Sequence, residues 1–207
     1  MRLFVSISVM LLAALACLAA PTGLLTMPTA ETLGLGAVRL SADYKSQHFY
    51  ANDEKWIGGI QAGAIFGLEA GIDEVGSKPV ANAKWRFMSD LLLPAVAVGV
   101  QNLASGKKPQ LYAVATKSLI VAKSAVSLGV LRDGADVYHT MLGATAGFGP
   151  ISVQAEQLHA DHLNQTNAGL SFSTSGLTFT GIVYNVTKSS RTLGGTVSYT
   201  LNLMPLK

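Results

Sequence analysis

The segment 192–203 alternates strictly between apolar and uncharged polar residues. One face carries Leu193, Gly195, Val197, Tyr199, Leu201 and Leu203, and the other carries Thr192, Gly194, Thr196, Ser198, Thr200 and Asn202. Successive side chains of a β-strand point to opposite faces, so this period of two predicts a strand with one apolar face. No charge interrupts either face between Thr192 and Pro205.

The same alternation recurs along the chain, with turn-like stretches rich in Gly, Asp, Asn, Ser and Pro between the repeats. The pattern predicts twelve strands, at 36–49, 56–66, 68–75, 79–88, 94–104, 109–120, 122–132, 137–147, 151–160, 166–174, 177–186 and 191–203. Short strands at this regular spacing are typical of an all-β protein.

Composition excludes several other classes. The chain has 207 residues, of which 49% are hydrophobic and 13% are charged, against about 25% charged in an ordinary soluble domain. Its net charge of +3 is too small and too scattered to indicate nucleic-acid binding. A single Cys excludes a disulfide scaffold, and no run of about 18 apolar residues follows residue 20.

The first twenty residues have the layout of a secretory signal peptide. Arg2 precedes an almost continuous apolar run from Leu3 to Ala20, which small residues close before Pro21. We expect cleavage after Ala19 or Ala20, with an uncleaved anchor or a lipidated Cys17 as the alternatives. Residues 21–207 then form a single β-barrel domain.

Three architectures fit twelve alternating strands: a soluble sandwich, a soluble barrel and a transmembrane barrel. The export signal, the even strand number and a polar face of Ser, Thr, Gly, Asn and Gln favour the last. We therefore predict an antiparallel up-and-down transmembrane β-barrel in a bacterial outer membrane, with lipid and the barrel-assembly machinery as partners. The alternative is a secreted or periplasmic soluble β-barrel that binds an apolar or glycan ligand.

Aromatic residues near the strand ends suggest two interfacial girdles. One set comprises Phe66, Phe87 and Phe148, and the opposite set comprises Phe49, Tyr50, Trp56, Tyr112 and Tyr138.

Charged residues on the polar faces are the candidate site. A charge facing lipid is costly, about 2–4 kcal/mol for Arg or Lys at the midplane, so these side chains should line the lumen. The candidates are Arg39, Glu69, Asp73, Lys84, Arg86, Lys117 and Glu156. They would form either an ion-pair network that fills a narrow barrel or a constriction that selects small solutes or sugars. A hairpin about residues 76–78 would place Glu69 opposite or beside Lys84 and Arg86, and Asp73 nearer to Asn82.

We expect no segment long enough to form a plug domain. We also expect no enzyme activity, because no nucleophile motif or metalloprotease motif is present. His159 and His162 bracket an Ala-Asp pair, which we interpret as a solvated loop, so we predict no metal and no cofactor.

Two stretches resemble the YjbH-like bacterial outer-membrane proteins. The first is PTGLLTMPTAETLGLGAVRLSADY, with its matching residues Gly23, Leu24, Pro28, Thr29, Ala30 and Gly36. The second is NAKWRFMSDLLLPAVAVGVQNLASG, with Lys84, Trp85, Arg86, Pro94, Ala95, Ala97, Val98, Gly99 and Gln101, and VATKSL around Lys117 loosely fits the strand that follows. The resemblance covers about a third of the chain. It implies an outer-membrane barrel, either a narrow pore or an envelope structural component, with a link to exopolysaccharide export.

Overall fold

The computed structural model describes residues 23–46, 54–73, 79–103, 106, 108–120, 123–160, 163–189 and 191–204. Within these ranges the chain forms twelve strands and one short 3-10 helix. They are β1 (Ala37–Ser46), β2 (Glu54–Gly63), η1 (Ile65–Gly67), β3 (Leu68–Asp73), β4 (Val80–Met88), β5 (Ala95–Leu103), β6 (Gln110–Ser118), β7 (Ala125–Arg132), β8 (Tyr138–Phe148), β9 (Ile151–Ala160), β10 (Leu163–Thr174), β11 (Leu177–Tyr184) and β12 (Thr192–Asn202).

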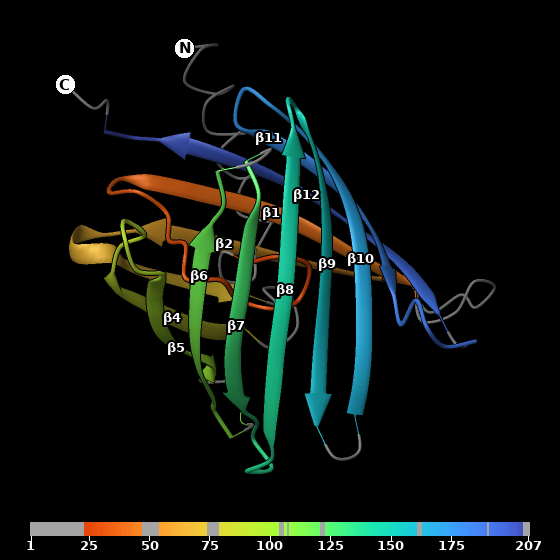
Figure 1. Cartoon of the computed structure of the whole chain (residues 1–207). Helices are drawn as coiled ribbons and strands as arrows, with labels where there is room; N and C mark the ends of the chain where they lie inside the picture. Colours follow the sequence, from red (N-terminus) through yellow and green to blue (C-terminus); the bar gives the residue numbers. More distant parts are fainter. Residues whose placement is uncertain are drawn as a thin grey trace, which may run out of the picture.

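The strands form one closed antiparallel barrel in which each strand pairs with its neighbours in sequence (Figure 1). Strand β1 closes the barrel against β12, with Ala37 opposite Asn202 and Lys45 opposite Gly194. Closure leaves no free sheet edge, so every strand has partners on both sides. The all-β prediction and all twelve predicted strands are confirmed. The second strand ends at Gly63, earlier than predicted, because the chain then reverses through η1, in which Phe66 has φ at 58°.

Burial is inverted relative to a soluble protein, because polar side chains lie inside the barrel and apolar ones cover the outside. Gln61, Glu69 and Lys84 are almost completely buried, whereas Leu68, Trp85 and Leu170 are exposed. These residues alternate along their strands, as the sequence predicts. The outer surface is therefore an apolar belt, and the polar face lines the lumen.

The turns at the end where β1 begins are tight. Ser175 and Gly176 join β10 to β11, and both have positive φ, 46° and 86°. Two positive φ values in a two-residue loop match the right-handed twist of the paired strands. At the same end, Gly149 and Pro150 join β8 to β9.

Most of the described aromatics lie where the girdle prediction puts them, on the outside. Phe66, Phe87, Phe148 and Tyr138 are all exposed. Tyr112 is the exception: it faces the lumen and is 4% exposed, so its assignment to a girdle is wrong.

Some predictions fall on residues whose structure is not described. The predicted signal peptide at 1–20, together with Phe49 and Tyr50, lies outside the described ranges, and the side chain of Trp56 is also not described. No helix among the described residues is long and apolar enough to cross a membrane.

Candidate functional site

Residues 23–36 precede β1 and fold back into the lumen; we call them the inner segment. Met27, Thr29 and Ala30 are buried against the inner wall. A tight turn shapes this stretch, with the Leu24 N–H donating to the Met27 carbonyl at 2.9 Å. The sequence predicts no segment long enough for a plug domain, and that prediction does not anticipate this short segment in the lumen. A short extended strap with no internal alternation fills the space that a separate domain would fill in a wider barrel.

The carboxylate of Glu156 on β9 holds one end of the inner segment. It accepts hydrogen bonds from the backbone N–H groups of Leu25 at 3.1 Å, Thr26 at 2.9 Å and Met27 at 3.0 Å. It also accepts from the Thr26 hydroxyl and from Asn167 Nδ2, the latter at 2.8 Å. Consecutive N–H groups that converge on one anion form a strong, charge-assisted cradle. Glu156 therefore faces the lumen and binds the backbone of the inner segment.

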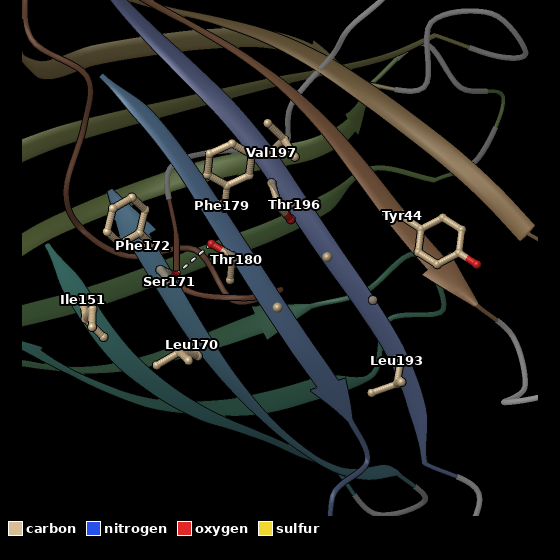
Figure 2. Close-up of a pocket in the computed structure, with 13 residues that line it drawn as sticks. Tyr44, Ile151, Leu170, Ser171, Phe172, Phe179, Thr180, Leu193, Thr196 and Val197 are labelled. Atoms are coloured by element: carbon tan, nitrogen blue, oxygen red, sulfur yellow. Dashed lines mark hydrogen bonds between the residues drawn. The ribbon is translucent and has the colours of Figure 1, made fainter. Parts of the chain in front are cut away.

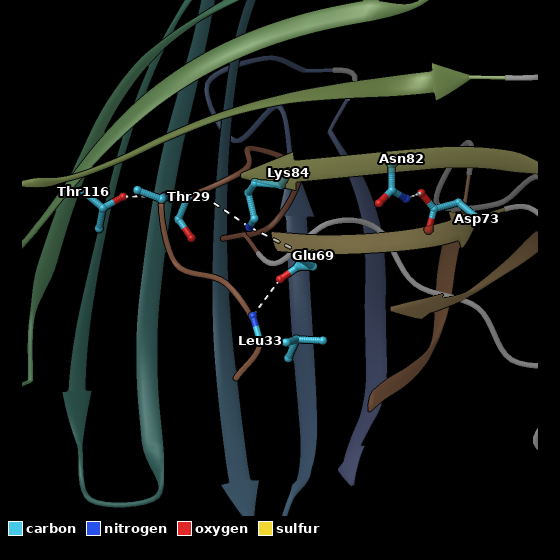
Figure 3. A network of polar contacts seen from close by, with 8 residues as sticks. Thr29, Leu33, Glu69, Asp73, Asn82, Lys84 and Thr116 are labelled. Atoms are coloured by element: carbon cyan, nitrogen blue, oxygen red, sulfur yellow. Dashed lines mark hydrogen bonds and ion pairs between the residues drawn. The ribbon is translucent and has the colours of Figure 1, made fainter. Parts of the chain in front are cut away.

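A buried ion pair holds the other end, as Figure 3 shows. Lys84 on β4 lies directly opposite Glu69 on β3, and their Nζ and Oε1 atoms are 3.6 Å apart. Glu69 accepts the Leu33 N–H at 2.8 Å, and Lys84 donates to the Thr29 carbonyl at 3.3 Å. The side chains of both ions are at most 1% exposed. The predicted cross-strand pairing is confirmed, and the structure adds that each ion also bonds to the inner segment.

Two lumen-facing glycines provide the space that the inner segment needs. A Cβ on Gly63 would lie 2.2 Å from the carbonyl oxygen of Gly34, which is backbone and cannot move aside. A Cβ on Gly143 would lie 2.2 Å from Leu24 Cδ1. Glycine is therefore the only residue type that fits at position 63 beside the inner segment.

One half of the lumen wall is apolar, and the inner segment packs on it. Met27 and Ala30 share a buried cluster with side chains of β5 to β8. Those wall residues are Ala95, Ala97, Tyr112, Val114, Leu131 and Met141, with Leu158 of β9 packed at the edge. A hydrogen bond also holds the segment against this wall: the Ala30 N–H donates to Thr116 Oγ1 at 2.9 Å.

The inner segment separates two polar cavities. One, of about 190 Å³, lies against β1 and β9 to β12, and we call it the hydroxyl vestibule because Ser and Thr dominate its lining. The other, of about 410 Å³, is lined by residues that include Asp133, His139 and Gln165. Thr26 and Pro28 of the inner segment line both cavities, together with Gln101 of β5. The stretch that Glu156 holds therefore lies between the two cavities and borders each of them.

A third hollow lies on the outer apolar belt, across β10 to β12 and the edge of β1 (Figure 2). Its volume is about 590 Å³, and Leu170, Phe172, Phe179 and Leu193 frame it. The bottom of the hollow is backbone, because Gly181 and Gly195 lie opposite each other at outward positions of neighbouring strands and have no side chains to fill it.

Arg39, Asp73 and Arg86 also face the lumen. Arg39 lies opposite the buried Gln61, and Arg86 lies opposite the buried Ala97. Asp73 accepts a 2.6 Å hydrogen bond from Asn82, in agreement with the predicted proximity of the two.

Lys117 does not face the lumen, so its prediction as a lumen residue is wrong. On β6 the side chains of Tyr112, Val114 and Thr116 point inward and are buried, which turns Lys117 to the outer face. There its Nζ donates to Asp90 Oδ1 at 2.6 Å, in the turn between β4 and β5. Hydrogen bonds from Lys117 and from Ser118 lower the pKa of Asp90 to about 2. The pair ties the turn between β4 and β5 to the end of β6.

Among the described residues, no three His, Cys, Asp or Glu side chains gather as a group that could hold a metal ion. His159 is exposed on β9, whereas His162 lies outside the described ranges. A different pair forms at the far end of the barrel, where His139 Nε2 and Asp133 Oδ2 are 2.9 Å apart.

Comparison with known proteins gives a fold but no family. No family model matches the chain, and no curated protein matches its sequence. Among solved structures, the KdgM porin in complex with disordered oligogalacturonate aligns with a TM-score of 0.58 at 12% identity, over 79% of this chain and 98% of that one. A mutant of the Rh. blastica porin aligns with a TM-score of 0.44 at 15% identity, over 72% of this chain and 55% of that one. The first of these alignments supports the barrel fold alone.

Proposed function

We propose that the chain is a bacterial outer-membrane β-barrel with a narrow pore that its own inner segment closes. One observation carries the proposal: the inner segment divides two polar cavities and is held there by side chains of the wall rather than by strand pairing. Bonds of this kind can break without disrupting the barrel, because the twelve strands keep their own hydrogen bonds. The role is that of a conduit, with no catalytic step assigned to any residue.

The outer surface supports the membrane part of the proposal. Leu128, Leu170 and Phe172 belong to a large set of apolar side chains that are exposed all around the barrel. A soluble barrel that binds a ligand would place such a belt in water, whereas lipid solvates it without cost. We therefore favour a membrane barrel, with lipid and the barrel-assembly machinery as its partners, over a soluble barrel.

An envelope structural component is the second candidate, and a specific observation favours it. The apolar cluster around Met27 and the buried Lys84–Glu69 pair fill the lumen as a packed core would. The link to exopolysaccharide export rests only on the resemblance to the YjbH-like proteins and stays a prediction.

Bilayer recordings test the pore directly. The protein is extracted from outer membranes in detergent and compared with a variant lacking residues 23–34. We expect the full chain to be closed for most of the recording and the deletion to conduct steadily, because the partition is gone. A heat-dependent shift on gels reports whether each barrel is folded. A folded deletion variant that conducts no better than the full chain would favour the structural role, and extraction without detergent would favour the soluble barrel.

Cysteine labelling tests the orientation. Asn164 lies near the end of the barrel opposite the start of β1, and Ser175 lies in the turn at the β1 end; both are exposed. With the N-terminus in the periplasm, Asn164→Cys should react with an impermeant maleimide on intact cells, and Ser175→Cys should react only after lysis. Labelling of the two positions at equal rates on intact cells would contradict this topology.

A further inference from the structure

The hydroxyl vestibule is lined very differently from the rest of the lumen. Ten of its lining residues are Ser or Thr, supplied by β1, β9, β10, β11, β12 and the inner segment. Arg39 and Asp43 are the charged residues among those that line it. A hydroxyl is both a donor and an acceptor, so a wall of hydroxyls is complementary to a solute that is itself rich in hydroxyls.

Several of these polar groups have no partner within the described part of the protein. Ser171 pairs with Thr180 at 2.8 Å, and Ser173 pairs with Thr178 at 2.9 Å. By contrast, the structure gives no hydrogen bond to the hydroxyls of Ser152, Ser198 and Thr200 in its described residues, although all three line the cavity. Two buried atoms at the same cavity are also unpaired, Arg39 Nε and Gln154 Oε1. Unpaired buried polar atoms are costly, and a polar occupant would satisfy them.

Arg39 and the hydroxyls of Ser198 and Thr200 lie close together. Arg39 lies directly opposite Thr200 in the strand register, and Ser198, two positions along β12, lies opposite Ser41. Residues that face each other across antiparallel strands have Cβ atoms about 4.5–5.5 Å apart, a spacing that one small molecule can bridge. The cavity volume of about 190 Å³ is below the ~300–1,000 Å³ of pockets for drug-sized ligands, so it suits an occupant of monosaccharide size.

Electrostatics decide between a neutral and an acidic occupant. Arg39 is a positive group in this wall, but it is already under the influence of the carboxylates of Glu69, Asp43 and Asp73. Asp43 itself lines the cavity and accepts a 2.5 Å hydrogen bond from Thr196. An anion placed beside Arg39 would therefore also face nearby negative charges, which raises its free energy. A neutral solute avoids this repulsion.

We propose that the hydroxyl vestibule binds a small, neutral, polyhydroxylated solute such as a monosaccharide or sugar alcohol. Arg39, Ser198 and Thr200 are its principal contacts. The proposal rests on the proposed function, because it names the class of solute that such a pore would admit. Binding at the vestibule does not itself require the inner segment to move, so it can be tested separately from conduction.

Saturation-transfer NMR on the full chain in detergent tests the site, with mannitol and galacturonate as probes. We expect transfer to mannitol and much less to galacturonate. In the Ser198→Ala/Thr200→Ala variant the mannitol signal should fall about fivefold or more, because two hydrogen bonds to the solute are lost. Thr174→Ala is the matched control, since Thr174 is exposed on the outer face of β10. The heat-dependent gel shift confirms that each variant is folded.

The outcomes separate this inference from the proposed function. An undiminished mannitol signal in the folded double variant, no transfer to mannitol, or a galacturonate signal as strong as that of mannitol would overturn the inference. Any of these results would leave the bilayer recordings to decide whether the barrel is a pore. Mannitol binding that depends on Ser198 and Thr200 supports the inference, and a barrel that binds in this way but never conducts would reject the pore alone.

Discussion

Replacing Glu156 with alanine is expected to convert a closed barrel into a conducting one. The carboxylate accepts three consecutive backbone N–H groups of the inner segment and the Thr26 hydroxyl. Hydrogen bonds to a charged group contribute about 1.5–3 kcal/mol each, so the closed state should lose ~3 kcal/mol or more. That loss raises the ratio of open to closed barrels about a hundredfold. The open probability in planar bilayers measures it.

Gln154→Ala is the matched control for this prediction. Gln154 lies on the same face of β9, one inward position away, and its amide bonds to Ser171 rather than to the inner segment. The control removes a similar volume from the lumen wall but leaves the partition in place, so it should stay closed. Glu156→Gln keeps the shape and removes the charge, and its open probability should lie between the two. If all three variants fold and none conducts, apolar packing alone holds the inner segment.

Replacing Lys84 with alanine is expected to destabilise the barrel strongly. The substitution removes the cation that pairs with Glu69, at a position that is 2% exposed, and leaves Arg39 as the remaining positive charge that acts on it. Removing one partner of a buried ion pair costs about 3–5 kcal/mol, because the remaining charge stays buried and uncompensated. Urea unfolding from lipid vesicles, followed by tryptophan fluorescence, measures the free energy of unfolding.

Two further variants show whether the loss comes from the ion pair. Arg86→Ala removes a cation from the same face of β4, two residues along, where the described residues provide no ion pair to it; we expect a change below about 1 kcal/mol. The Glu69→Gln/Lys84→Met double variant removes both charges and should recover a large part of the lost stability. Equal losses in Lys84→Ala and Arg86→Ala would mean that the buried pair has no special role.

The strands were predictable because the alternation rests on many residues at once. Shifting any strand by one position would turn a whole apolar face into the lumen, so the pattern fixes both the strand and its orientation. The Glu69–Lys84 pairing followed from the short connection between β3 and β4. Strand ends were less predictable, as at Phe66, where an apolar residue that continues the pattern adopts a positive φ.

The error at Lys117 has a physical cause. On β6 the inward residues Tyr112 and Val114 are largely apolar and belong to the same buried cluster as Met27 of the inner segment. The outward residues Ala113 and Ala115 are small. The larger apolar side chains of this strand therefore lie on its inner face, and the sequence pattern predicts the wrong orientation. A rule that places polar residues inside fails on a strand whose inner face is covered by another part of the chain.

The inner segment was missed for a related reason. It has no alternation and forms no strand, so periodicity assigns it only to the connection between the predicted signal peptide and β1. The available signals were indirect. Lumen positions at Gly63 and Gly143 are glycine where a polar side chain would continue the pattern, and Glu156 has no basic residue opposite it on β10, where its partner is Asn167. Together these features indicate a wall shaped to receive backbone.

The division of the lumen wall into an apolar half and a hydroxyl half determines how long an opening lasts. When the inner segment leaves, Met27 and the wall residues Val114 and Met141 that share its cluster become exposed to water. Burying one such side chain again is worth about 1.5–3 kcal/mol, so the exposed wall draws the segment back. The polar contacts of Glu156 set when the segment is released, and the apolar half supplies the restoring force. Each opening therefore ends by itself, with no external source of energy.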